Sequence, residues 1–172
     1  MNTKRHIMLD LETMGSGSNA AIVAIGAVAF DTGIRSKFYA KVHLASSIES
    51  GGRVDAGTVL WWLQQSDAAR KELHTADKTD TVQKACLNFT AWYADCNGGA
   101  VWGNGATFDN VILRNTFDRL CFPAPWSFRD DRCFRTVKAL HPKVDVPVSG
   151  TTHNALHDAT WQAQYLIKLG VL

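Results

Sequence analysis

The sequence has few cysteines, little net charge and no long hydrophobic run, and each absence excludes a class of protein. The four cysteines include no C-x-x-C pair, so neither a zinc ribbon nor a redox motif is indicated. Their wide spacing is typical of reduced thiols, and we expect a cytoplasmic protein. The N-terminus leads into a short apolar segment that Asp10 interrupts, which is neither a signal peptide nor a membrane span.

The length and charge of the chain limit its organisation and its partners. A net charge of +2 is too small to indicate a nucleic-acid partner, although it does not exclude one whose phosphates are bound through metal ions. The 172 residues contain no internal repeat, low-complexity tract or domain linker. With 46% hydrophobic residues, the chain suits one domain with a sizeable core. We therefore expect a single domain over residues 1–172.

The hydrophobic pattern predicts an α/β fold that begins with three strands joined by short turns. Alternating residues at 6–13, a continuous apolar run at 20–30 and a second alternating segment at 37–43 predict an antiparallel meander. Further short strands are expected at 100–103 and 126–129. The expected helices are 58–65, 80–96, one ending near 120, one capped by Asp130 or Asp131 and ending near 140, and 154–169. Residues 44–57 and 141–152 are expected to be connections.

Four acids occupy positions where this pattern predicts burial or its edge. Asp10 and Glu12 share one face at the end of the first strand, roughly 6.6 Å apart, and would repel each other without a cation between them. Asp109 interrupts the apolar stripe of its helix, and Asp158 flanks the apolar face of the last helix. Taken singly, the first two could be a solvated strand end, and Asp109 could pair with an arginine. Together, all-oxygen ligands favour Mg²⁺ or Mn²⁺ over zinc.

Three motifs contain these acids: D-L-E-T at 10–13, N-G-A-T-F-D at 104–109 and H-N-A-L-H-D-A at 153–159. Their order and rough separations resemble those of the DEDD 3′–5′ exonucleases of the H-x-x-x-x-D (DEDDh) subtype, in the ribonuclease H-like superfamily. The resemblance covers residues 5 to 170. The short chain and its Trp61–Trp62 pair are similar to small stand-alone members, such as the mycobacterial-type exoribonuclease and related prophage exonucleases.

The resemblance implies a ribonuclease H-like fold, with a mixed sheet, antiparallel first strands and helices on both faces. It also implies a metal-dependent 3′–5′ exonuclease that releases nucleoside 5′-monophosphates from single-stranded RNA or DNA. Two Mg²⁺ or Mn²⁺ ions would activate a water and stabilise the leaving oxygen. Asp10 would bridge the ions, Glu12 and Asp158 would bind the ion that holds the water, and Asp109 would complete the other site. His153 would be the general base.

The family pattern places the terminal nucleotide along Leu11, Thr13 and Met14, with Asn104 and Phe108. Small members of the family often dimerise, so the resemblance leaves a homodimer open. The sequence contains no predicted membrane span, so we expect no membrane partner.

Two tryptophans stand side by side on the first predicted helix. Because neighbouring helical residues point about 100° apart, either Trp61 or Trp62 can be core while the other lies near the surface. Packing of both indoles and stacking of one on a nucleobase are both open interpretations.

Two other functions share parts of this pattern. A ribonuclease H-like endonuclease would share the metal site but not the H-x-x-x-x-D ending. A catalytically silent nucleic-acid-binding domain would keep the fold, although the intact acids and His153 argue against it. The sequence does not decide between RNA and DNA. His157, four residues after His153, is predicted to point toward solvent.

Overall fold

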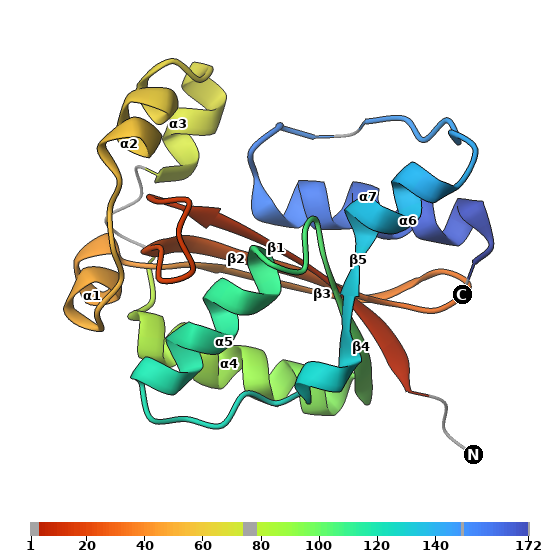
Figure 1. Cartoon of the computed structure of the whole chain (residues 1–172), viewed down its shortest axis with the longest axis horizontal. Helices are drawn as coiled ribbons and strands as arrows, with labels where there is room; N and C mark the ends of the chain where they lie inside the picture. The colour runs from red at the N-terminus through yellow and green to blue at the C-terminus, as the bar shows by residue number, and fades with distance from the viewer. Residues whose placement is uncertain (1–3, 74–78, 149, 172) are drawn as a thin grey trace.

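The computed structural model describes residues 4–73, 79–148 and 150–171, and at its centre is a five-stranded sheet (Figure 1). The strands are β1 Arg5–Thr13, β2 Ile22–Phe30, β3 Ile34–Lys41, β4 Gly98–Gly103 and β5 Asp131–Cys133. They lie in the order β3-β2-β1-β4-β5. Neighbours among the first three strands are antiparallel, whereas β4 runs parallel to β1 and β5 parallel to β4. The predicted mixed sheet is confirmed.

Helices cover both faces of this sheet. On one face, α4 Val82–Asp95 and α5 Asp109–Arg119 pack against the side chains of Ile7, Leu9 and Leu11 from β1. On the other face, α6 Phe134–Leu140 and α7 Ala155–Leu169 pack against Met8 and its neighbours. Figure 1 shows the two pairs of helices on opposite sides of the strands. The alternation of β1 therefore separates two hydrophobic cores, with Asp10 and Glu12 on the α7 side.

Two glycines let helix ends come close to the sheet. A Cβ on Gly26 of β2 would lie 2.2 Å from the carbonyl carbon of Ala155, the first residue of α7. A Cβ on Gly103 of β4 would lie 3.1 Å from the Cβ of Asp109, the first residue of α5. Gly26 pairs with Asp10 across β1 and β2. The absence of a side chain at Gly26 therefore brings the start of α7 next to Asp10.

Three short helices, α1 Leu44–Glu49, α2 Ala56–Leu63 and α3 Asp67–Leu73, lie at one end of the sheet (Figure 1). Helix α2 is the predicted 58–65 helix, and α3 lies in a stretch without a prediction. The prediction that 44–57 is only a connection is wrong, because it contains α1. The buried hydroxyl of Ser47 accepts the backbone N–H of Ile22 at 2.8 Å. A tertiary contact of this kind leaves no periodic pattern in the sequence.

The segment before α6 also differs from prediction. Residues 128–130 form a 3₁₀ helix rather than part of a strand, and β5 begins only at Asp131. Neither Asp130 nor Asp131 caps α6, because that helix begins at Phe134 after Cys133.

Tertiary hydrogen bonds explain the position of β5. The Asp131 carboxylate accepts from Trp126 Nε1 and from Asn110 Nδ2, both at 2.8 Å. Its Oδ1 also lies 3.2 Å from a guanidinium nitrogen of Arg114. These partners tie the start of β5 to α5, so Asp131 serves as an anchor and not as a helix cap.

The end of the chain agrees with its prediction. Helix α7 begins after Asn154, whose side chain accepts the backbone N–H of His157. The described residues of the 141–152 loop form no helix or strand, and residue 149 lies outside the described residues, as do residues 1–3 of the predicted N-terminal segment. In the part of the chain that the structure describes, no helix has the length and apolar character needed to cross a membrane.

Candidate active site

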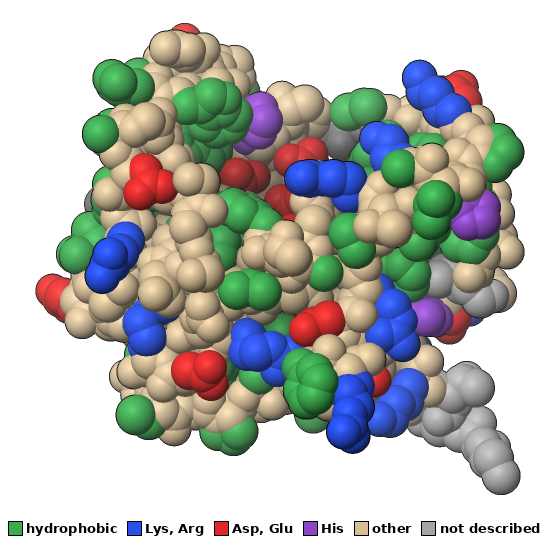
Figure 2. All heavy atoms as spheres, in the orientation of Figure 1, with side chains coloured by type: hydrophobic (Ala, Val, Ile, Leu, Met, Phe, Trp, Pro, Cys, Tyr) green, Lys and Arg blue, Asp and Glu red, His purple; other side chains and the backbone are tan. Residues whose placement is uncertain are grey.

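A cleft of about 420 Å³ opens beside β1 and the start of α7. It is lined by all five residues predicted to be catalytic, by three predicted to bind substrate and by three that were not predicted: Asp10, Glu12, Asp109, His153 and Asp158; Leu11, Asn104 and Phe108; Arg135, Trp161 and Gln162. Figure 2 shows acidic side chains inside this hollow and a histidine at its edge.

Asp10, Glu12 and Asp158 converge in the cleft. Each offers a carboxylate oxygen, and these atoms lie within 4.8 Å of one another. Burial raises the pKa of Asp10 well above its usual range, and the charges of Asp109, Glu12 and Asp158 raise it further. Burial also raises the pKa of Asp158. Glu12 is buried, and Asp10 and Asp158 are half-buried. Carboxylates that repel one another and offer only oxygen ligands fit a divalent cation such as Mg²⁺ or Mn²⁺.

Asp109 lines the same cleft beside this group of three. Its Oδ1 accepts the backbone N–H of Leu11 at 3.1 Å, and its Oδ2 accepts that of Asn104 at 2.9 Å. Burial raises the pKa of Asp109 from 3.8 to about 7, although these hydrogen bonds oppose the rise. The ion pairs of the described residues do not include Asp109, so the arginine-pair interpretation is not supported.

His153 stands at the edge of the cleft, in the loop before α7. Its backbone has a left-handed conformation, with φ of 61°. Its N–H donates to Asp158 Oδ2 at 3.1 Å, and its ring packs edge-on against Trp61 with centroids 4.9 Å apart. The loop is thus held both at its backbone and at the imidazole.

His157 does not line the cleft, but the prediction that it points to solvent is wrong. The side chain is half-buried, and its Nδ1 accepts the backbone N–H of Thr151 at 3.0 Å. Because Thr151 precedes His153 by two residues, this bond holds the loop that carries His153. The loop folds back over α7, which a helical projection of α7 alone does not show.

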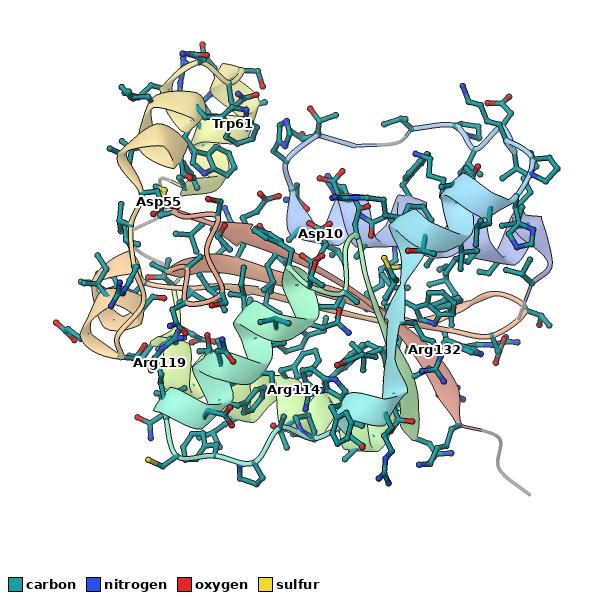
Figure 3. The ribbon with its side chains drawn as sticks, viewed as in Figure 1. Asp10, Asp55, Trp61, Arg114, Arg119 and Arg132 are labelled. Atoms are coloured by element: carbon teal, nitrogen blue, oxygen red, sulfur yellow. The ribbon has the colours of Figure 1, made fainter. Side chains whose placement is uncertain are left out.

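The two indoles divide as the helical geometry predicted. Trp62 is 3% exposed, and its Nε1 donates to the backbone oxygen of Thr13 at 2.9 Å. Trp61 is 41% exposed and contacts His153 at the edge of the cleft. Figure 3 shows Trp61 on α2, across the open side of the cleft from Asp10. Thr13 and Met14 are not among the residues that line the cleft.

Gln162 is a site residue that the sequence analysis missed. It lies one turn after Asp158 on α7, is 2% exposed, and donates from Nε2 to Asp10 Oδ1 at 2.7 Å. In the described part of the chain, its buried Oε1 has no hydrogen-bond partner. The i, i+4 spacing from Asp158 was the available signal, since such residues share a helix face.

The mixed sheet with helices on both faces is a ribonuclease H-like fold, and solved structures have a similar fold. The structure of Escherichia coli exonuclease I in complex with a dT13 oligonucleotide matches this chain with a TM-score of 0.70 and 15% sequence identity. The match covers 98% of this chain and 41% of the exonuclease I chain. The complex of the same exonuclease with a dA16 oligonucleotide matches with a TM-score of 0.64 and 14% sequence identity, over 94% of this chain and 40% of the exonuclease I chain.

The family model of the 3′–5′ exoribonuclease Rv2179c-like domain matches residues 5–169, and the chain belongs to this family of 3′–5′ exonucleases. The predicted membership of the DEDD exonucleases is confirmed. The exodeoxyribonuclease of Enterobacteria phage T4 is 30% identical over 125 residues, in an alignment that covers 62% of this chain and 52% of that protein. The chain thus spans about half the length of this relative.

Proposed function

We propose that the protein is a divalent-metal-dependent 3′–5′ exonuclease that releases nucleoside 5′-monophosphates from single-stranded RNA or DNA. The main support is the convergence of Asp10, Glu12 and Asp158 within 4.8 Å, in a cleft that also contains Asp109 and His153. The oligonucleotides bound by Escherichia coli exonuclease I support a single-stranded substrate.

Asp10, Glu12, Asp109 and Asp158 would hold two Mg²⁺ or Mn²⁺ ions, with Asp10 shared between them. Bound ions of this kind supply Lewis-acid activation of the water and of the scissile phosphate. The residues themselves fix the geometry: Asp109 is held by two backbone N–H groups, and Asp10 by the amide of Gln162. A preorganised set of carboxylates does not have to reorient during the reaction.

His153 would accept the proton of the attacking water. Its ring is held edge-on by Trp61, and its backbone is bonded to Asp158. A general base must be held within hydrogen-bond reach of the proton that it removes, and these two contacts hold the imidazole at the edge of the cleft.

The terminal nucleotide would lie against Leu11, Asn104 and Phe108, which line the cleft. Trp61 would offer a stacking face to a base, because its indole is 41% exposed beside the cleft. Trp62 is buried and donates a hydrogen bond to the backbone oxygen of Thr13, so it does not offer a stacking face. Thr13 and Met14 do not line the cleft, so the substrate roles predicted for them would be indirect, through the end of β1 and the residue that follows it.

Cleavage of end-labelled strands tests this function. With Mg²⁺, 5′-labelled single-stranded RNA or DNA should be shortened stepwise from its 3′ end, and a 3′-phosphate should slow the reaction because its charge would enter the acidic cleft. Comparing the cleavage rates of RNA and DNA strands gives the preference for ribose or deoxyribose. Internal cuts in a circular single strand would indicate an endonuclease. Binding without cleavage, in Mg²⁺ and in Mn²⁺, would indicate a silent binding domain.

A homodimer stays a prediction, and sedimentation can check it.

A further inference from the structure

The cleft contains one positive charge among its acids. Of its lining residues in the described part of the chain, Arg135 alone is an arginine or lysine. It is exposed, whereas Asp109, across the same cleft, is 2% exposed. Asp109 and Glu12, which is 7% exposed, therefore lie at the floor of the cleft, and the guanidinium lies toward its exposed side.

The guanidinium of Arg135 is held by one hydrogen bond, and its other N–H groups remain available as donors. Its Nη2 donates to the backbone oxygen of Asn104 at 2.8 Å, which is its one hydrogen bond within the described ranges. A Cβ built on Gly105 would lie 3.7 Å from Arg135 Cζ and 3.8 Å from each terminal nitrogen. Such nearly equal distances mean that a face of the guanidinium plane, and not its N–H edge, is turned toward Gly105. Guanidinium has five N–H donors, which leaves several for a ligand.

We propose that Arg135 binds a backbone phosphate of the bound strand, adjacent to the phosphate that is cleaved. The proposal rests on the proposed nuclease function. The cleaved phosphate must reach the floor where the carboxylates converge, so a group on the exposed wall meets the next phosphate along the strand. Phosphate is an anion whose geometry suits an arginine fork.

Charge supports the same assignment. Four carboxylates repel a polyanion, and a fixed cation at the entrance offsets part of this repulsion. The ion pairs of the described residues do not include Arg135, so its charge remains available to a ligand.

The salt dependence of binding tests the proposal. The probe is a 5′-fluorescein oligothymidylate, followed by fluorescence anisotropy in Ca²⁺, with gels confirming that the strand stays intact. Removing one contact between a cationic side chain and a phosphate should lower the magnitude of the slope of log K against log salt by about 0.7 for a single strand. The slope for Arg135→Ala should therefore be less steep by about this amount, and the slope for Arg135→Lys should stay close to that of the unmodified protein. Binding of thymidine 5′-monophosphate, which has no second phosphate, should be unchanged.

Arg132→Ala is the matched control, since it removes the same charge. Arg132 lies on β5, far from Asp10 in Figure 3, and bonds to the backbone oxygens of Arg129 and Asp131. Four results would each overturn the proposal. They are an unchanged slope in Arg135→Ala, an equal loss of slope in Arg132→Ala, equally weakened binding of the mononucleotide by Arg135→Ala, and no binding of the strand by the unmodified protein. If the slope falls as expected but the unmodified protein cleaves no strand in Mg²⁺ or Mn²⁺, only the proposed nuclease function fails.

Discussion

Gln162 of α7 donates a hydrogen bond to Asp10 of β1 at 2.7 Å, although the two residues are 152 positions apart in the chain. The bond engages Asp10 Oδ1 and leaves the second carboxylate oxygen for a cation. A carboxylate accepts hydrogen bonds, so the amide NH₂ must face Asp10, and this places Gln162 Oε1 elsewhere in the buried wall. Gln162 therefore acts as a positioning residue for the proposed bridging acid.

Gln162→Leu should weaken metal binding without unfolding the protein. Leucine has a similar size but cannot orient Asp10, and loss of a group that orients a metal ligand typically costs about 10–100-fold in metal affinity or activity. Titration calorimetry with Mn²⁺ measures the affinity directly. Gln164→Leu, on the exposed side of the same helix, is the control and should bind as the unmodified protein does. An unchanged affinity in Gln162→Leu would remove its positioning role.

Asp10→Asn should abolish hydrolysis while the fold survives. The amide keeps the shape of the side chain but removes the charge that the proposed cations share. It also removes one of several repelling buried charges, so the metal-free variant should melt no lower than the unmodified protein. Circular dichroism and thermal melting check the fold, and the labelled-strand assay checks the activity. Turnover like that of the unmodified protein in saturating Mg²⁺ would rule out the bridging role.

The metal-free protein should lose stability as pH rises toward neutrality. The folded-state pKa of Asp109 is about 7, above its usual 3.8, so the native state binds more protons than the unfolded state between these values. The contribution of Asp109 to the free energy of unfolding should therefore fall from about pH 4 to about pH 7, and then level off. The pKa values of Asp10 and Asp158 are also raised, so Asp109→Asn should make this part of the melting-temperature profile less steep without removing the slope.

Millimolar Mg²⁺ or Mn²⁺ should reverse this loss at neutral pH. An ion that binds only the folded state stabilises it by about 2.7 kcal/mol at a concentration one hundred times its Kd. Melting curves at several ion concentrations measure the effect. If neither ion raises the melting temperature at any concentration, the four acids do not form a cation site.

Replacing the two histidines should have unequal effects. A general base contributes roughly 10²–10⁴-fold to a rate, so His153→Ala should lose about that much turnover while still binding metal. His157→Ala removes the acceptor for the N–H of Thr151, so it should loosen the loop and cost far less. Single-turnover rates in saturating Mg²⁺ compare the two variants. An equal loss, or a larger one at His157, would show that the base is assigned to the wrong histidine.

The sequence by itself determined the elements that carry the acids. Asp10 and Glu12 follow from the period-two alternation of β1, and Asp109 interrupts the 3.6-residue period of α5. Such patterns are local, since each residue is placed by neighbours within a few positions. The motifs around these acids were enough to identify the family and, through it, the mixed sheet.

Only the tertiary structure decided which other residues join the site. The spacing of Gln162 from Asp158 indicates their shared helix face but not that Gln162 is buried. It is enclosed because Gly26 lets α7 lie close to the strand that carries Asp10. Likewise, β5 begins at Asp131 because Asn110 and other distant residues bond to its carboxylate. Contacts between distant parts of the chain depend on how whole elements pack, and no local period of the sequence records them.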